Sequence, residues 1–271
     1  MTTPFRSDDS AARDKRWLRT AIQIFFLLTV ALAVRLPHLD RYGFWQDEVV
    51  HLLQSELLKD VWLHGELASN HLPLFPTILS VWRGLFPSAG EWEMRLMSVG
   101  FGVAAVLALW VCGRALFGLQ HGFWAALLLA VSPFHVHASR DLKDASLISL
   151  TAVLAVFALY QARVRNRRRD WAIYVVFALV ESYSDIFAAP LIFAANLWFM
   201  LSLIRTEEKF PRKTLTSWFI SNSLVVIAFL PYFGVMLSQA RDRLVHAESY
   251  LQAPNMWAVA FYLKTIAFGY S

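Results

Sequence analysis

The chain has 271 residues, of which 57% are apolar, 15% aromatic and 17% charged, and its mean hydropathy is +0.46. Soluble domains are typically about 45–50% apolar and about 25% charged, so this composition leaves too little polar surface for a water-soluble globule. A single cysteine excludes a disulfide-stabilised scaffold, and no charge-rich low-complexity tract indicates disorder or a coiled coil. The net charge of +5 raises the question of nucleic-acid binding, which the distribution of the charges decides.

Long apolar runs recur along the chain, and a transmembrane helix needs about 20 mostly apolar residues. The runs predict seven spans and the start of another, at residues 17–36, 92–112, 122–134, 145–162, 171–187, 188–204, 215–238 and 256–271. They do not alternate as strands of about ten residues would in a β-barrel. Because backbone polar groups in lipid must pair within the protein, we expect an all-α polytopic membrane protein, a helical bundle of about seven to eight spans.

Lysine and arginine residues gather on one side of these predicted spans. They crowd the head before residue 17, the loop 163–170 with its run from Arg163 to Arg169, and the loop 205–213. The positive-inside rule therefore places the N-terminus in the cytoplasm, with residues 1–16 as a cytoplasmic tail. The arginine run then fixes the topology and is not a nucleic-acid patch, so no nucleic-acid partner is expected.

The first span has a competing interpretation. A basic head, an apolar stretch from Ala21 to Val34 and the small residues Ala31 and Ala33 imitate a secretory signal with its cleavage site. A signal anchor that stays as a helix is the simpler account, because the later spans require a membrane in any case. Residues 17–271 are therefore expected to form a single transmembrane domain.

Residues 37–91 form the one long connection between predicted spans, and the orientation places it outside the membrane. Its segments 49–63 and 74–86 have the apolar spacing of helices that lie along a membrane surface. Asp47 and Glu48 are adjacent in this loop, and adjacent carboxylates near an apolar surface are costly unless they are paired or used. They mark a candidate site. The alternative is that Asp47 caps a helix starting at Glu48, and the two roles are compatible.

Several short motifs follow one another in the first part of the chain. They are Arg35-Leu36, Phe44-Trp45-Gln46-Asp47-Glu48, Asn70-His71-Leu72-Pro73-Leu74-Phe75, Glu93-Met94-Arg95-Leu96, and Ser132-Pro133-Phe134 through Ser139-Arg140-Asp141-Leu142-Lys143-Asp144. In this order they resemble the C-type polyprenyl-phosphate-sugar glycosyltransferases (family 39-like), particularly bacterial relatives of the protein O-mannosyltransferases and the aminoarabinose lipid A transferases. The resemblance covers about residues 20–162, and Leu72 departs from the family's His-Pro-Pro-Leu stretch. The chain looks like the N-terminal part of such an enzyme.

The resemblance implies a membrane glycosyltransferase that moves a sugar, with inversion, from a polyprenyl-phosphate donor to a protein, lipid or glycan acceptor on the extracytoplasmic face. It places the general base on Asp47, while Glu48 would orient the acceptor or help to bind a metal. The leaving phosphate needs cations, and Arg140 and Lys143 are spaced so that one helical face could present both. Their alternative is a snorkelling pair at the start of the fourth span. His71 could hydrogen-bond the donor or acceptor, or be a structural histidine in a turn.

No motif identifies a cofactor. His135 and His137 form a weak candidate for a metal site because no third ligand stands at a fixed spacing, so a divalent metal ion stays open. A bacterial inner membrane is the expected location, with membrane lipids, the lipid-linked donor and the acceptor as partners. A non-enzymatic transporter, flippase or assembly subunit stays open, as does a truncated inactive family member. The charges gather outside the spans, at 37–91 and 135–144, which favours the enzyme over a transporter.

Overall fold

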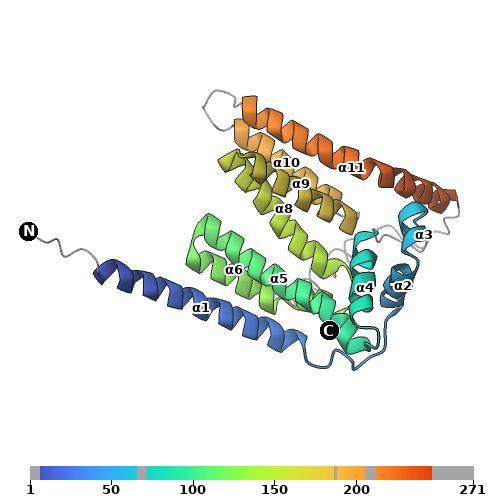
Figure 1. Ribbon diagram of the computed structural model, residues 1–271, viewed down its shortest axis with the longest axis horizontal. Coiled ribbons are helices and arrows are strands. Elements are labelled where there is room, and N and C mark those ends of the chain that lie inside the picture. Colours follow the sequence, from blue (N-terminus) through green and yellow to red (C-terminus); the bar gives the residue numbers. More distant parts are fainter. Residues whose placement is uncertain (1–6, 66–71, 186–187, 205–211, 246–271) are drawn as a thin grey trace, which may run out of the picture.

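The computed structural model describes residues 7–65, 72–185, 188–204 and 212–245, and the elements in these ranges are α-helices (Figure 1). They are α1 (Ser7–Arg35), α2 (Gln46–Glu56), α3 (Leu58–Leu63), α4 (Leu74–Leu85), α5 (Glu91–Phe117), α6 (Leu119–Val131), α7 (Pro133–Arg140), α8 (Ala145–Arg165), α9 (Arg168–Ser184), α10 (Ala188–Ile204) and α11 (Arg212–Val245). The expected all-α fold is confirmed.

Four helices are long and apolar enough to cross a membrane, by length and composition. They are α1 from Trp17 to Arg35, α5, α8, and α11 from Arg212 to Ser238. These helices match the predicted spans 17–36, 92–112, 145–162 and 215–238. α9 and α10 occupy the two other predicted segments as helices of 17 residues each. The run predicted from Met256 onward lies outside the described residues.

The predicted span 122–134 is a broken helix. α6 ends at Val131, α7 begins at Pro133, and the two axes are bent by 60°. Proline has no backbone N–H and clashes with the preceding turn, so it begins a helix more readily than it continues one. Together α6 and α7 form a fifth candidate span, or a re-entrant one.

The helices predicted in the long loop are present, with one correction. The continuous helix predicted at 49–63 is wrong: α2 ends at Glu56, and α3 starts at Leu58 after Leu57 takes φ −102° and ψ 36°. α4 matches the predicted segment 74–86. The three helices gather at one end of the bundle (Figure 1).

Trp62 explains why the chain turns after α2. Its indole Nε1 donates to Thr77 Oγ1 of α4 at 3.0 Å, and its ring lies against Tyr183 of α9 and Tyr232 of α11, with centroids 5.5 and 6.1 Å apart. Tertiary packing therefore decides where the helix breaks.

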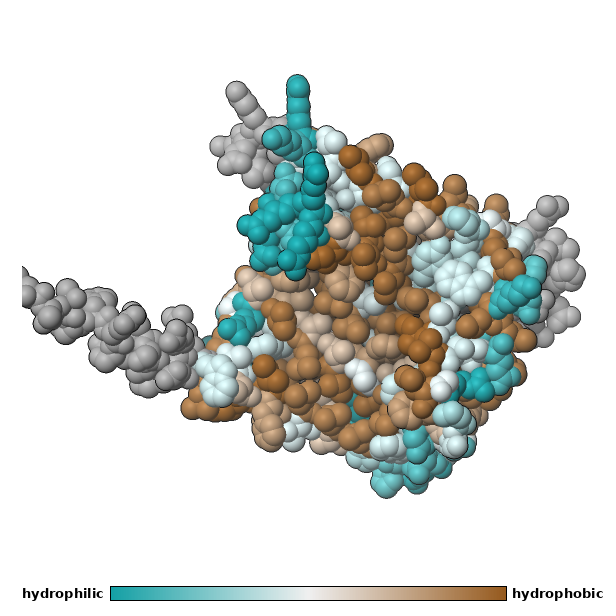
Figure 2. All heavy atoms as spheres, in the orientation of Figure 1, coloured by the Kyte–Doolittle hydropathy of each residue, from teal (hydrophilic) through white to brown (hydrophobic). Residues whose placement is uncertain are grey.

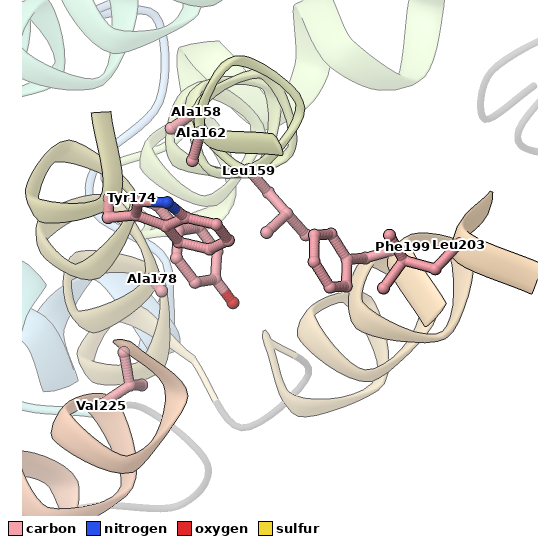
Figure 3. Packing of buried hydrophobic residues seen from close by; sticks show 9 residues of the cluster. Ala158, Leu159, Ala162, Tyr174, Ala178, Phe199, Leu203 and Val225 are labelled. Atoms are coloured by element: carbon pink, nitrogen blue, oxygen red, sulfur yellow. The ribbon is translucent and has the colours of Figure 1, made fainter. Parts of the chain in front are cut away.

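The bundle is held by two apolar clusters. One joins the four helices α8, α9, α10 and α11. Figure 3 shows Leu159, Tyr174 and Phe199 of this cluster pointing into the space between α8, α9 and α10. The other joins α1, α5 and α6 through residues that include Leu27, Val106 and Trp110. Hydrophobic residues cover the middle of the face seen in Figure 2, and hydrophilic residues gather at its edges. This distribution is typical of a bundle whose flanks lie in lipid.

Close packing of α5 against α6 depends on two glycines. A Cβ atom at Gly113 would lie 2.9 Å from Gly122 Cα, and one at Gly122 would lie 2.8 Å from Trp110 O and 2.9 Å from Arg114 Cα. Small residues allow this close backbone approach, and in lipid such van der Waals packing drives helix association.

We predict that Gly122→Ala destabilises the bundle by about 1–3 kcal/mol, because the added methyl group meets backbone that cannot move aside. Gly100→Ala on α5 is the matched control, since its Cβ would have nothing within 4 Å. Thermal unfolding in micelles should separate the two variants. Equal melting temperatures for both would contradict the close contact.

Candidate functional site

A buried ion pair between Glu48 and Arg95 fixes α2 to α5. Arg95 Nε donates to Glu48 Oε1 at 2.8 Å, and Arg95 Nη2 donates to Oε2 at 2.7 Å. Arg95 is 5% exposed and Glu48 is 0% exposed. A bidentate arrangement of this kind is the strongest geometry available to an arginine and a carboxylate.

Backbone donors complete the coordination of the Glu48 carboxylate. The Trp45 N–H donates to Oε2 at 2.8 Å and the Leu142 N–H to Oε1 at 2.7 Å. One carboxylate thus joins the start of α2 to α5 and to the turn between α7 and α8. Burial alone would raise the pKa of Glu48, but the hydrogen bonds from Arg95, Leu142 and Trp45 hold it below its ordinary value.

Arg95 also fixes the segment that leads from α1 to α2. Its guanidinium donates to the carbonyl oxygens of Leu39, Tyr42 (2.9 Å) and Gly43 (3.1 Å). The same group lies 5.3 Å from the centre of the Phe44 ring. The segment before α2 therefore wraps around one buried cation.

The turn at 141–144 places Lys143 opposite Asp47. Leu142 is buried in an apolar cluster with Phe75 and Leu79 of α4, while its N–H is held by Glu48. The next residue then reaches outward, and Lys143 Nζ donates to Asp47 Oδ2 at 2.8 Å. Asp47 is 57% exposed and Lys143 30% exposed, so this pair faces the solvent side of the site.

Asp141 adds a third carboxylate to the site, after Glu48 and Asp47. Asp141 is 17% exposed and lies 3.8 Å from His137 Nε2. Burial, with a smaller contribution from Glu48, raises the pKa of Asp141, although His137, Lys143 and Arg95 oppose the shift. Burial lowers the pKa of Lys143, but its hydrogen bond to Asp47 and the nearby carboxylates raise it overall, so the ammonium stays charged.

The structure corrects two local predictions. Asp47 does not cap a helix starting at Glu48: α2 begins at Gln46, Trp45 is the capping residue, and the Glu48 carboxylate accepts the Trp45 N–H. Asp47 instead lies in the first turn, where its charge is favourable to the helix dipole. Arg140 and Lys143 do not share a helical face, because α7 ends at Arg140 and α8 begins at Ala145.

The remaining predicted residues are spread around the site. Arg140 Nη2 donates to the carbonyl oxygens of Pro37 at 2.7 Å and His38 at 3.4 Å, just past the end of α1. His137 lies at the edge, 57% exposed, next to Asp141. His71 lies outside the described residues.

The imidazole of His135 lies within hydrogen-bond distance of a buried arginine. Arg35, 0% exposed at the end of α1, lies with Nη2 2.8 Å from His135 Nδ1, and its Nη1 donates to Ala31 O and Ala130 O at 3.0 and 2.9 Å. The arginine thereby binds the carboxyl-terminal carbonyls of α1 and α6, where a cation is favourable. A metal ion at His135 would be repelled by this guanidinium. Within the described ranges, no three His, Cys, Asp or Glu side chains are grouped to hold a metal.

Sequence reasoning missed Arg95 and Asp141 as members of the site. Arg95 stands near the end of an apolar span, where arginine commonly snorkels toward the interface. A signal was available in the Glu93-Met94-Arg95-Leu96 motif, since a buried arginine in a membrane protein needs an acid and Glu48 was an acid without an assigned partner.

Comparisons with known proteins agree with this architecture. A family model described as dolichyl-phosphate-mannose-protein mannosyltransferase matches residues 70–234. The chain belongs to this family. No curated protein matches the sequence.

A solved structure of similar fold is the apo crystal structure of ArnT from Cupriavidus metallidurans. The TM-score is 0.62 and the sequence identity 15%, over 94% of this chain and 48% of that one. At this identity the similarity is one of fold. This member of the mannosyltransferase family spans about half the length of that protein.

We predict that Glu48→Gln destabilises the protein by about 3–5 kcal/mol, because the amide leaves the Arg95 charge buried without a counter-ion. The matched control is Glu56→Gln, which breaks the ion pair with Arg83 but at a site where Glu56 is 54% exposed. That change should cost about 1 kcal/mol or less. Unfolding in detergent by a denaturant measures both.

The pH dependence gives a second readout for the same pair. Since the folded pKa of Glu48 is depressed, its stabilising effect is complete above the unfolded value of about 4.3 and is lost as pH falls through the folded value. The wild type should lose stability across this acidic window, and Glu48→Gln should show a flatter profile. Identical profiles would contradict the assigned ion pair.

Proposed function

We propose that this chain belongs to a membrane glycosyltransferase that transfers a sugar from a polyprenyl-phosphate donor to an acceptor on the extracytoplasmic face. The observation that carries the proposal is the pairing of Asp47 with Lys143, a carboxylate and an ammonium joined at 2.8 Å on the exposed side of a buried, hydrogen-bonded frame. Membership of the mannosyltransferase family supports the same class of reaction.

Asp47 is the proposed general base. An acceptor hydroxyl must lose its proton as its oxygen attacks the anomeric carbon, and a carboxylate within hydrogen-bond reach can accept that proton. Asp47 is 57% exposed, so an acceptor can approach it without moving the backbone. Attack opposite the departing phosphate inverts the configuration at the anomeric carbon.

Lys143 is proposed to contact the donor phosphate in addition to its ion pair with Asp47. An ammonium group has three N–H donors, and the bond to Asp47 Oδ2 uses one of them. A donor phosphate beside Lys143 would draw the ammonium away from Asp47 and leave that carboxylate a stronger base. Arg140, whose Nη2 is bonded to the segment after α1, is the second proposed contact for the phosphate. Cations here stabilise the charge that develops on the leaving group.

Glu48 receives a different role from the one that the resemblance implies. Its two oxygens accept four hydrogen bonds from Arg95, Trp45 and Leu142, and its side chain is fully buried. We infer that Glu48 is a positioning residue, which sets the distance between Asp47 and Lys143 through their chain neighbours.

The proposed location is a bacterial inner membrane with the N-terminus in the cytoplasm. The end of α8, the start of α9 and the short turn between them carry Arg165, Arg167, Arg168 and Arg169, and this end of the two helices lies remote from α2 (Figure 1). The positive-inside rule then assigns the arginine-rich end to the cytoplasm and the Asp47–Lys143 pair to the opposite face.

Thiol labelling checks this orientation. In a Cys112→Ala background, Asp60→Cys should react in intact cells with an impermeant thiol reagent, whereas Arg167→Cys should react only after permeabilisation. Both positions are surface positions, so burial does not decide the outcome. Reaction of the cysteine at 167 in intact cells would place the proposed site in the cytoplasm and refute the orientation.

We predict that Asp47→Asn folds and inserts normally but lowers the rate of sugar transfer by about 10²–10⁴, because the amide cannot accept the proton. The assay is transfer of label from radiolabelled polyprenyl-phosphate sugars in membranes that express the protein. Asp60→Asn is the matched control, since Asp60 is an exposed first-turn acid on α3.

The outcome of the Asp47 experiment tests the assignment of the base. If wild-type membranes transfer sugar and Asp47→Asn does so equally well at matched expression, Asp47 is not the base. Lys143→Gln should instead weaken donor use by roughly 1.5–3 kcal/mol, the value of a hydrogen bond to a charged group.

A further inference from the structure

An apolar recess lies between the helices of the bundle, and neither Asp47 nor Lys143 lines it. It has a volume of about 640 Å³ and is bounded by α5, α6, α8 and α10. This volume falls within the range of small-molecule sites, about 300–1,000 Å³. Its walls are almost wholly apolar and include Leu116, Phe117, Val156, Phe157 and Trp198.

The recess lies toward the arginine-rich end of the bundle. Its α5 wall runs from Leu109 to Phe117, the carboxyl-terminal third of that helix. At 1.5 Å per residue, Phe117 is roughly 33 Å along the helix from Arg95. The recess therefore extends along the bundle from Ala152, about 10 Å along α8 from Ala145, to Phe117, and neither Asp47 nor Lys143 lines it.

Two of the aromatic residues that line the recess are exposed at the surface of the bundle. Phe117 is 70% exposed and Trp198 40% exposed, and both line the cavity. Large apolar side chains exposed on the flank of a membrane bundle face hydrocarbon, so a ligand entering here comes from the bilayer. An apolar chain fits the walls better than any polar solute.

Arg163 contacts Trp198, one of the residues that line this recess. Its guanidinium carbon is 5.7 Å from the centre of the Trp198 ring, and Nη2 donates to Ser202 O at 3.1 Å. Nε is buried and has no hydrogen-bond partner in the structure. Among the described residues, no carboxylate forms an ion pair with Arg163. Within the described ranges, Arg163 is thus a cation that has no ion-pair partner and packs against a wall of the apolar cavity.

We propose that the recess binds one acyl chain of an anionic glycerophospholipid, with the phosphodiester held by Arg163. Guanidinium groups match phosphate geometry through paired N–H donors, and basic pockets between transmembrane helices bind anionic headgroups. The apolar walls take the chain, and Arg163 supplies the charge that selects an anionic headgroup. The site requires neither donor nor acceptor, so it stands whether or not the proposed sugar transfer is correct.

Photocrosslinking with a defined lipid tests the site. The wild-type chain is reconstituted in nanodiscs with a phosphatidylglycerol that carries a diazirine in one acyl chain, and the labelled peptides are mapped by mass spectrometry. Label is expected on α5, α8 and α10 residues around Phe117, Val156 and Trp198. The same probe with a phosphatidylcholine headgroup should label these peptides about tenfold less, the effect of one hydrogen bond to a charged group.

Two matched pairs of variants separate the chain from the headgroup. Ala152→Phe fills the cavity and should abolish labelling, whereas Ala33→Phe on the exposed face of α1 should not. Arg163→Gln should reduce the preference for phosphatidylglycerol about tenfold. Arg165→Gln removes an arginine that is 52% exposed and lies 4.0 Å from Asp170, and it should leave the preference unchanged.

Several results would overturn the proposal. Labelling that survives Ala152→Phe would show that the acyl chain lies outside the recess. Equal labelling by the two headgroups in the wild type would remove the role of Arg163. Labelling confined to peptides elsewhere would show that another part of the protein covers the cavity.

Discussion

The ion pair between Glu48 and Arg95 is the constraint on which the α2 end of this protein depends. Both side chains are buried, so separating them would leave a charge without a partner in a medium that solvates it poorly. Each partner also binds backbone from another segment: Glu48 holds the turn before α8, and Arg95 holds the segment before α2. Three pieces of chain distant in sequence, around Glu48, Arg95 and Leu142, are thereby fixed around two side chains.

This arrangement assigns different tasks to neighbouring residues. Glu48 and Leu142 are buried and bonded to each other, while Asp47 and Lys143, their immediate neighbours, meet on the exposed side. Because a peptide unit is rigid, fixing one residue of each pair limits where the other can go. The carboxylate of Asp47 is thus held in place without being buried itself, as the proposed role of a general base requires.

The sequence predicted the helices better than their connections. Long apolar runs fix a helix in lipid regardless of its neighbours, so α1, α5, α8 and α11 lie where hydropathy places them. The break at Leu57 and the turn before Ala145 depend on contacts made by Trp62 and Leu142 with distant helices, and no local pattern encodes those contacts. Asp47 and Lys143 could be recognised as candidates from the sequence alone. Their pairing and the role of Arg95 depend on contacts between distant segments, so they became visible only in the fold.

The buried position of Arg35 has a consequence for the order in which the protein assembles in the membrane. Its hydrogen-bond partners Ala130 and His135 follow it by 95 and 100 residues. While α1 stands alone in the bilayer, this guanidinium must extend to the headgroups, as arginines at helix ends do. It can enter the interior only when α6 and α7 arrive. Docking of α1 is therefore a late step, completed after the intervening loop and α5 have been synthesised.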